Sequence, residues 1–115
     1  MVGRVLKVAT CQFAVGCGIN RNSRVICEYL HKARKARVDI VHFSECALSG
    51  YVGTDFPNFE QYDWNLLREE TERIMALAAK LHLWVVLGST HRLTEPNKPH
   101  NSLYLIGSED RKSVV

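Results

Sequence analysis

The chain has 115 residues, of which 46% are hydrophobic and 23% are charged, a balance typical of a globular domain and not of a disordered or fibrous protein. At this length we expect one domain with one modest core. The formal charge of +3 reflects 15 basic and 12 acidic residues, and basic side chains concentrate in HKARKAR, residues 31–37. Because that stretch has no interleaved aromatic or glycine partner, we interpret it as a solvated helix face, with nucleic-acid binding as the less favoured alternative.

The spacing of the cysteines and the length of the apolar runs indicate whether the chain forms disulfides, binds zinc or crosses a membrane. The chain has four cysteines: Cys11, Cys17, Cys27 and Cys46. No pair of them has CxxC spacing and no secretory signal precedes them, which predicts reduced thiols without a zinc site or a disulfide framework. No apolar run approaches the roughly 20 residues that a membrane helix needs. We therefore predict a soluble cytoplasmic protein with no metal, no cofactor and no membrane partner.

The first half of the chain reads as strand, helix and strand. Residues 5–13 are rich in β-branched and aromatic side chains and predict a strand. Residues 20–23 offer capping side chains for an amphipathic helix, whose apolar positions recur at helical spacing: Val25, Ile26, Tyr29, Leu30, Ala33 and Ala36. Residues 39–43, DIVHF, are typical of a strand that is buried on both faces, and His42 within them is interpreted as a hydrogen-bonded core histidine.

A long loop and a second helix follow. Residues 44–63 carry two glycines and a proline without a sustained period, and a loop of this length in a small domain is usually functional. Asp63 can cap the next helix, one face of which is apolar: Leu67, Thr71, Ile74, Ala78 and Leu81.

The last third predicts three strands. Residues 84–89 form the third strand, residues 94–101 a surface turn, residues 102–106 the fourth strand, and residues 111–115 a fifth strand after a turn at 107–110. Strands joined by a helix are parallel neighbours with right-handed connections, and the last two strands form a hairpin. The order therefore predicts an α/β fold with a mixed sheet.

Ligands of such sheets bind outside the carboxyl ends of the strands, so the residues after each strand are the candidates for chemistry. Glu45 directly follows the second strand and precedes an apolar stretch, and such surroundings disfavour a charged carboxylate and suit a general base. A structural ion pair or capping role is the alternative. Cys46 beside it is interpreted as a buried small hydrophobe that faces away from Glu45 and not as a nucleophile.

The residues after the third strand are weaker candidates. His91 and Arg92 could bind an anionic substrate group, although surface residues satisfied by backbone carbonyls are the commoner case. No two histidines have metal-ligand spacing. A nucleotide-binding domain is disfavoured, because neither GxGxxG nor a P-loop follows the first strand.

The segments VATCQF, DIVHFSECALSGY, WVVLGS and NSLYLI together resemble the N-terminal part of a carbon-nitrogen hydrolase of the nitrilase superfamily. The resemblance implies half of an α-β-β-α sandwich, a mixed sheet with helices on one face. It also implies that Glu45 is the general base of a Glu-Lys-Cys catalytic set and that Tyr51 matches the tyrosine that closes the motif. Tyr51 and His91 are the candidate substrate-binding residues.

The chain departs from the family pattern at three places. Ser44 replaces the usual proline, and Arg37 with Val38 replaces a Gly-Ala pair, so that a non-glycine residue occupies a helix end that favours left-handed geometry. The family's lysine and cysteine come after the region matched here, so residues 1–115 are expected to form a partial domain that stops before them.

The resemblance implies hydrolysis of an amide, N-carbamoyl or nitrile bond of a small molecule by a homo-oligomeric enzyme without a cofactor. We expect the 115-residue chain to be inactive alone. The alternative function is a non-catalytic half-fold that serves as a binding or dimerising module, because half a sandwich leaves an uncovered sheet face and an unpaired edge.

Overall fold

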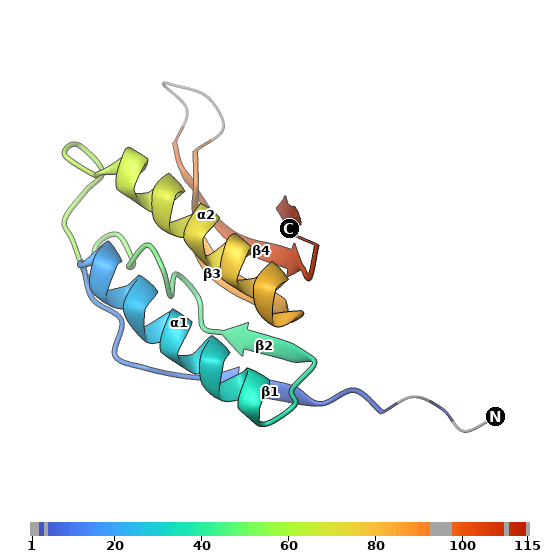
Figure 1. The fold of residues 1–115 in the computed structure, drawn as a ribbon. Coiled ribbons are helices and arrows are strands. Elements are labelled where there is room, and N and C mark those ends of the chain that lie inside the picture. The colour runs from blue at the N-terminus through green and yellow to red at the C-terminus, as the bar shows by residue number, and fades with distance from the viewer. Residues whose placement is uncertain (1–2, 4, 93–97, 110, 115) are drawn as a thin grey trace.

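A five-stranded mixed sheet with two helices on one face makes up the fold (Figure 1). The structure is a computed structural model that describes residues 3, 5–92, 98–109 and 111–114. The elements, in chain order, are β1 (Val8–Cys11), α1 (Ile19–Lys35), β2 (Ile40–Phe43), α2 (Trp64–Leu81), β3 (Trp84–His91), β4 (His100–Gly107) and β5 (Arg111–Val114). The sheet order is β1-β2-β3-β4-β5, so each strand lies beside its neighbours in sequence.

The pairing directions confirm the predicted mixed sheet. β1, β2 and β3 are parallel, and β3, β4 and β5 are antiparallel. β3 and β4 are both longer than predicted, because they pair along a continuous ladder from Val85 with Ile106 to His91 with His100. Of the predicted turn, residues 94–97 lie outside the described residues, whereas His100 and Asn101 belong to β4.

The core lies between the helices and the face of the sheet that they cover. Val41 and Phe43 of β2 are fully buried there, whereas His42 between them is exposed on the opposite face. The prediction that β2 is buried on both faces and that His42 is a core histidine is therefore wrong. Both helices cover the same face of the sheet, so alternate residues of β2 point to the face that is left uncovered.

Helix α1 begins earlier than the capping pattern predicted. Gly18 is the N-cap and no side chain caps the helix, so residues 20–23 lie inside it. Asn22 is fully buried and joins two loops: its amide nitrogen donates to the carbonyls of Gly16 (2.8 Å) and Leu48 (3.1 Å). The Gly16 amide in turn donates to the Asn22 side-chain oxygen at 3.1 Å. Asn22 therefore ties α1 to the segment that follows β2.

The end of α1 confirms the expected left-handed residue. Arg37 has φ 57°, the region in which glycine has no steric penalty. Replacing Arg37 by glycine is expected to raise the free energy of unfolding by about 1 kcal/mol, because it relieves this strain at an exposed position. Urea denaturation measures the change, and Arg34→Gly within α1 is the control, which should instead destabilise by about 1 kcal/mol. Equal effects of the two glycines would contradict the explanation.

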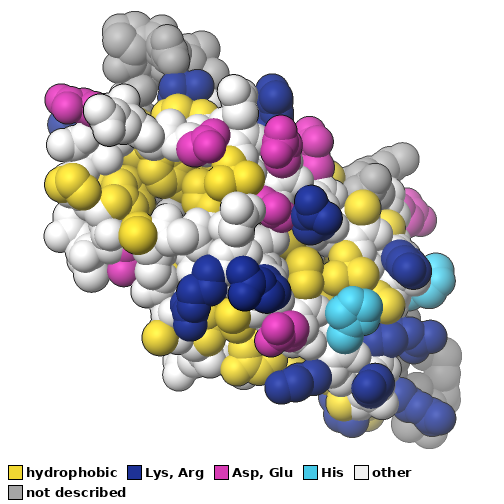
Figure 2. Space-filling view, turned by 60° about the vertical axis from the view of Figure 1, so that its left-hand side comes forward, with side chains coloured by type: hydrophobic (Ala, Val, Ile, Leu, Met, Phe, Trp, Pro, Cys, Tyr) yellow, Lys and Arg dark blue, Asp and Glu magenta, His cyan; other side chains and the backbone are white. Residues whose placement is uncertain are grey.

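The basic stretch of residues 31–37 is, as predicted, an exposed helix face apart from the buried Ala33. Three of its basic residues lie in the last turn of α1, where they favour the negative end of the helix dipole: Lys32, Arg34 and Lys35. Figure 2 shows one face of the whole molecule, on which Lys and Arg side chains are spread over the lower and right-hand parts and hydrophobic side chains gather at the upper left. Neither helix in the described ranges is long and apolar enough to cross a membrane.

Candidate functional site

The turn that carries Glu45 rests directly on strand β3. β2 ends at Phe43, and residues 45–49 form consecutive turns closed by hydrogen bonds from Ala47 to Ser44 (3.2 Å) and from Gly50 to Cys46 (2.9 Å). A Cβ atom on Gly88 would lie 2.2 Å from the Ser44 carbonyl oxygen and 2.7 Å from the Cys46 amide nitrogen. Only glycine at this position of β3 leaves room for the turn.

Two further contacts fix the same turn. The Leu48 amide donates to the Gly88 carbonyl at 3.1 Å, and the buried hydroxyl of Ser49 lies 3.0 Å from that of Thr90 on β3. Tyr62 donates its hydroxyl to the Ser49 carbonyl at 2.8 Å. The backbone around Glu45 is therefore held by β3 and by the far end of the 44–63 loop.

The Glu45 carboxylate lies at the surface and accepts a hydrogen bond from the side-chain amide of Asn101 on β4. The expectation that its apolar sequence neighbours surround it is wrong: Cys46, Ala47 and Leu48 are buried, but they turn into the core while Glu45 turns outward. An exposed carboxylate held by one amide can accept a proton from a group that approaches from outside.

Cys46 does not face fully away from Glu45, although it is buried as predicted. Its thiol lies 3.5 Å from the Asn101 side-chain oxygen, so Cys46 and Glu45 contact opposite ends of one amide. The strand alternation on which the prediction rested ends at Phe43, and Cys46 has φ 52°. Burial raises the pKa of the Cys46 thiol, hydrogen bonds with Ser49 and Thr90 oppose that rise, and the Glu45 charge adds to it. A raised thiol pKa disfavours the thiolate that a nucleophile requires.

The surface beside Glu45 is an open depression of about 300 Å³ at the carboxyl end of β2. Its walls come from β2, the following turn and β4: His42, Phe43, Ser44, Glu45, Asn101, Ser102 and Leu103. Such a position is where ligands of parallel sheets bind. Glu45 is the only carboxylate among these lining residues, with the Asn101 amide beside it, and His42 adds an imidazole to the same wall.

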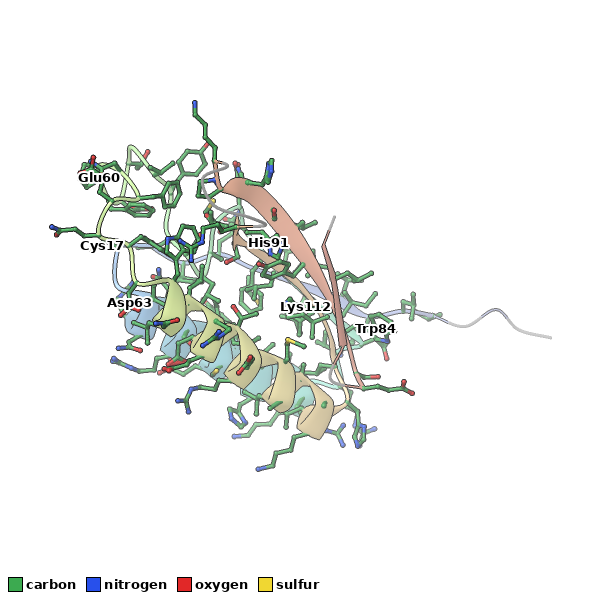
Figure 3. The ribbon with its side chains drawn as sticks, turned by 90° about the horizontal axis from the view of Figure 1, so that it is seen from above. Cys17, Glu60, Asp63, Trp84, His91 and Lys112 are labelled. Carbon is green, nitrogen blue, oxygen red and sulfur yellow. The ribbon has the colours of Figure 1, made fainter. Side chains whose placement is uncertain are left out.

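Tyr51 and His91 are not brought to the Glu45 carboxylate by any contact within the described residues. The Tyr51 side chain is 43% exposed, and its backbone is tied to Asp55, whose carboxylate accepts from the Tyr51 amide at 2.7 Å. His91 lies at the end of β3, where its Nδ1 is 2.8 Å from the Tyr104 hydroxyl. Figure 3 shows His91 on the helix side of the sheet. Their predicted role in substrate binding stays a prediction.

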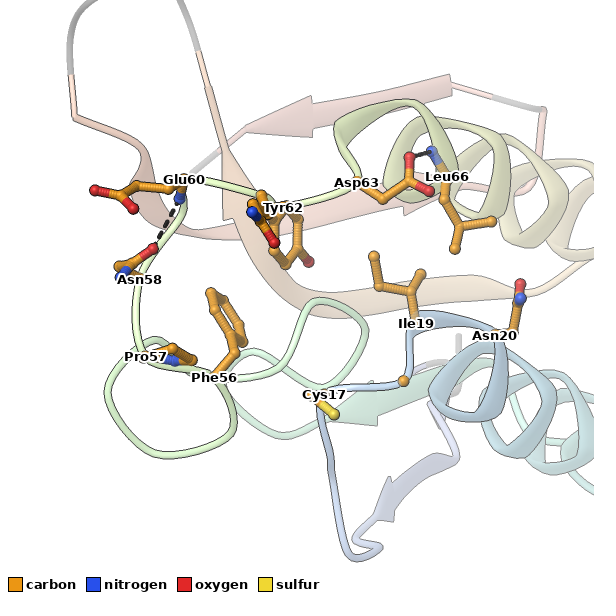
Figure 4. A pocket seen from close by; sticks show the side chains of 12 residues that line it. Cys17, Ile19, Asn20, Phe56, Pro57, Asn58, Glu60, Tyr62, Asp63 and Leu66 are labelled. Carbon is orange, nitrogen blue, oxygen red and sulfur yellow. Dashed lines mark hydrogen bonds between the residues drawn. The ribbon is translucent and has the colours of Figure 1, made fainter.

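A separate cavity of about 570 Å³ lies between the starts of α1 and α2 and the intervening loop (Figure 4). Its apolar walls include Phe56, which packs on Tyr62 with ring centroids 4.9 Å apart. Of its two carboxylates, Asp63 caps α2 as predicted by accepting from the Leu66 amide at 2.9 Å. Cys17, Glu60 and Asp63 share this lining, but no described hydrogen bond joins the Cys17 thiol to either carboxylate, so we do not assign the chemistry to it.

The described ranges contain no group of three or more His, Cys, Asp or Glu side chains arranged to hold a metal ion.

Asn101 and Gly88 are the two site residues that the sequence patterns missed. The sequence patterns predict a surface turn at Asn101, and only the antiparallel ladder that pairs it with Thr90 brings it beside Glu45. Gly88 carried a usable signal, because an isolated glycine inside a strand often marks a close approach of another backbone.

Comparison with known proteins identifies a family and a fold that the chain shares. A family model described as carbon-nitrogen hydrolase matches residues 7–112. A search of curated proteins finds no match. Among solved structures, a carbon-nitrogen hydrolase from Helicobacter pylori G27 matches with TM-score 0.78 and 18% identity over 96% of this chain and 38% of that one.

Two other solved structures show the same fold. An amidase from Nesterenkonia sp. matches with TM-score 0.80 and 16% identity over 98% of this chain and 42% of that one. The NitFhit protein of C. elegans matches with TM-score 0.69 and 20% identity over 96% of this chain and 28% of that one. The chain thus spans about two fifths of the length of the first two proteins and 28% of the length of the third.

Proposed function

The chain belongs to the carbon-nitrogen hydrolase family, and from this membership we propose that it contributes the general base, Glu45, to hydrolysis of a non-peptide carbon-nitrogen bond. The substrate class is a small amide, N-carbamoyl compound or nitrile. The observation that carries the proposal is the exposed Glu45 carboxylate at the carboxyl end of β2, held by Asn101 above a turn that β3 fixes.

The matched amidase supports the choice of substrate class. Solved forms of the Nesterenkonia amidase include a cysteine-to-alanine mutant in complex with butyramide. Another form, with acrylamide, also replaces a glutamate by glutamine. These forms point to small amides as the first compounds to test with the present chain.

In the proposed mechanism, Glu45 moves protons for a cysteine nucleophile. It accepts the thiol proton as sulfur attacks the amide carbon, and it returns that proton to the nitrogen as the carbon-nitrogen bond breaks and ammonia or an amine leaves. It then takes a proton from water as the water attacks the resulting thioester, and it returns that proton to sulfur as the carbon-sulfur bond breaks and the acid leaves. A lysine stabilises the oxyanion in both steps.

The nucleophile and the lysine are not assigned to any residue of this chain. No described hydrogen bond joins any of the four thiols to the Glu45 carboxylate: Cys17 lines the separate cavity between α1 and α2, and burial raises the pKa of Cys11, Cys27 and Cys46. The 115-residue chain is therefore expected to release no ammonia from butyramide or acrylamide. Clear Glu45-dependent release from this chain alone would show that it holds a complete catalytic set.

The test of Glu45 itself uses a completed hydrolase. A chimera joins residues 7–112 of this chain to the remainder of the Nesterenkonia amidase, with which it shares the fold, and ammonia release from butyramide is followed. Activity of this chimera that depends on Glu45 supports the proposal. Homo-oligomerisation of the completed enzyme stays a prediction.

A second function, a dimerising module, is favoured by the sheet face that the helices leave uncovered. Three large hydrophobic side chains are exposed on it: Val8 (55%), Trp84 (46%) and Leu105 (38%). Val8, Ile40 and Trp84 are in register across β1, β2 and β3, so they share that face. Figure 3 shows Trp84 on the side of the sheet away from the helices. A second copy of the chain is the occupant that would bury this face.

Replacing Trp84 by glutamate is expected to weaken such a dimer roughly 30-fold, because a buried tryptophan often carries about 2 kcal/mol of an interface. Sedimentation velocity across a concentration series measures the dissociation constant. Val52→Glu, a similar change at an exposed loop residue, is the matched control and should leave association unchanged. A well-folded wild-type monomer at high concentration would rule this function out.

A further inference from the structure

A second cavity with a concentration of positive charge lies on the helix side of the sheet. It has a volume of about 290 Å³ and is bounded by α2 on one side and by β3, β4 and β5 on the other. It shares no lining residue with the depression beside Glu45. Figure 3 shows His91 and Lys112 on this side of the sheet. Whatever binds here is therefore separate from the proposed catalytic carboxylate.

Three cations and a single carboxylate line this cavity. The cations come from three separate elements or their ends: Arg68 from α2, Arg92 directly after β3, and Lys112 from β5. Glu72 on α2 is the one carboxylate among the described lining residues. Because the cations converge from different segments, the excess charge is a product of the fold and not of one basic stretch of sequence.

Aromatic rings hold two of the three cations in place. The Arg92 guanidinium lies 4.6 Å from the centroid of the Trp64 ring, and the Lys112 ammonium lies 5.2 Å from that of Tyr104. Trp64 is itself packed on Tyr62, with centroids 4.8 Å apart, and stacked on Phe59 at 5.4 Å. Cations that are already positioned by rings lose less side-chain entropy when a ligand binds.

His91 lies in the lining of this cavity beside Tyr104. Its Nδ1 contacts the Tyr104 hydroxyl, and burial first, then the charges of Lys112 and of His100, lower its pKa. The charged or titratable groups around it come from every packed element: Arg68 and Glu72 on α2, Arg92 after β3, His100 and Tyr104 on β4, and Lys112 on β5. A bound anion would offset the repulsion that disfavours the imidazolium.

We propose that this cavity binds a small doubly charged oxyanion of the phosphate class, held by Arg92 and Lys112 with Arg68 at its rim. The volume suits inorganic phosphate or a small phosphate monoester, and Leu67 in the lining offers apolar surface for the organic part of such an ester. The site does not depend on the function proposed for Glu45.

The binding test uses the 115-residue chain and inorganic phosphate as the probe, in a phosphate-free buffer at low ionic strength. Calorimetry is expected to show saturable binding, and Arg92→Gln and Lys112→Gln are each expected to weaken it at least about 10-fold. Arg34→Gln and Lys35→Gln on the exposed face of α1 remove the same charges elsewhere and should change the affinity less than about 2-fold. Thermal unfolding checks that each variant is folded.

A second arm separates this cavity from general attraction to a basic protein. Sulfate stays doubly charged across the range, so its affinity is expected to rise from about pH 8 to about pH 5.5 as His91 gains a proton, and His91→Gln should flatten that rise. Absence of saturation by phosphate, or equal losses in the α1 controls and the cavity variants, would overturn the proposal. So would a pH dependence that His91→Gln leaves unchanged.

Discussion

Replacing Glu45 by glutamine is expected to lower ammonia release by the completed hydrolase roughly 10²- to 10⁴-fold, the usual contribution of general acid-base catalysis. Glutamine keeps the size of the side chain and can still contact the amide of Asn101, but it cannot take a proton from a thiol or from water. The loss should therefore appear in kcat, while KM for butyramide changes little.

Glu28→Gln is the matched control for this experiment. Glu28 is exposed on α1, so the same chemical change there should leave kcat within about 2-fold. Circular dichroism of both chimeras separates a catalytic loss from a folding defect. Turnover of the Glu45→Gln enzyme within about 10-fold of the parent would exclude Glu45 as the base.

Replacing Gly88 by alanine is expected to lower the free energy of unfolding by about 3 kcal/mol. The added methyl group would overlap the backbone of the turn, where the nearest atoms are the Ser44 carbonyl oxygen and the Cys46 amide nitrogen. Neither atom belongs to a flexible side chain that could move aside, so the turn must shift away from β3. The same shift should displace Glu45 and abolish activity of the completed hydrolase.

Urea denaturation of the 115-residue chain measures the effect of Gly88→Ala on stability. Gly16→Ala is the control: a Cβ atom there meets nothing within 4 Å, and the change is expected to stay within about 0.5 kcal/mol. Amide NMR shifts of residues 44–50 should move in the Gly88 variant and not in the control. An unchanged urea midpoint for Gly88→Ala would show that β3 does not fix the turn.

The topology could be predicted from the sequence because it depends on local patterns. The apolar spacing of both helices and the turns between strands fix the element order, and parallel strands joined by helices leave few alternatives. The same patterns failed where a residue's surroundings come from elsewhere in the chain. His42 reads as core from its neighbours in DIVHF, but only the placement of both helices on one face exposes it.

In the candidate site, the sequence singles out Glu45 but not the residues that support it. Glu45 could be singled out from its position after a buried strand and from the motif around it. Its exposure could not be predicted, because the left-handed backbone at Cys46 reverses the chain there. Asn101 could not be assigned to the site either, because it lies 56 positions after Glu45 in the sequence. Only the register of the β3–β4 ladder, which pairs Asn101 with Thr90, brings the two side chains together.

The separation of Glu45 and Asn101 along the chain sets the order in which the carboxylate acquires its partner during folding. As the polypeptide leaves the ribosome, β2 and the turn can form against β3 before β4 has been synthesised. The amide that orients Glu45 arrives only when β4 pairs antiparallel with β3. A hairpin between neighbouring strands forms quickly, whereas the parallel pairing of β1, β2 and β3 joins distant segments and is slow, so Glu45 is oriented as soon as β4 adds to that sheet.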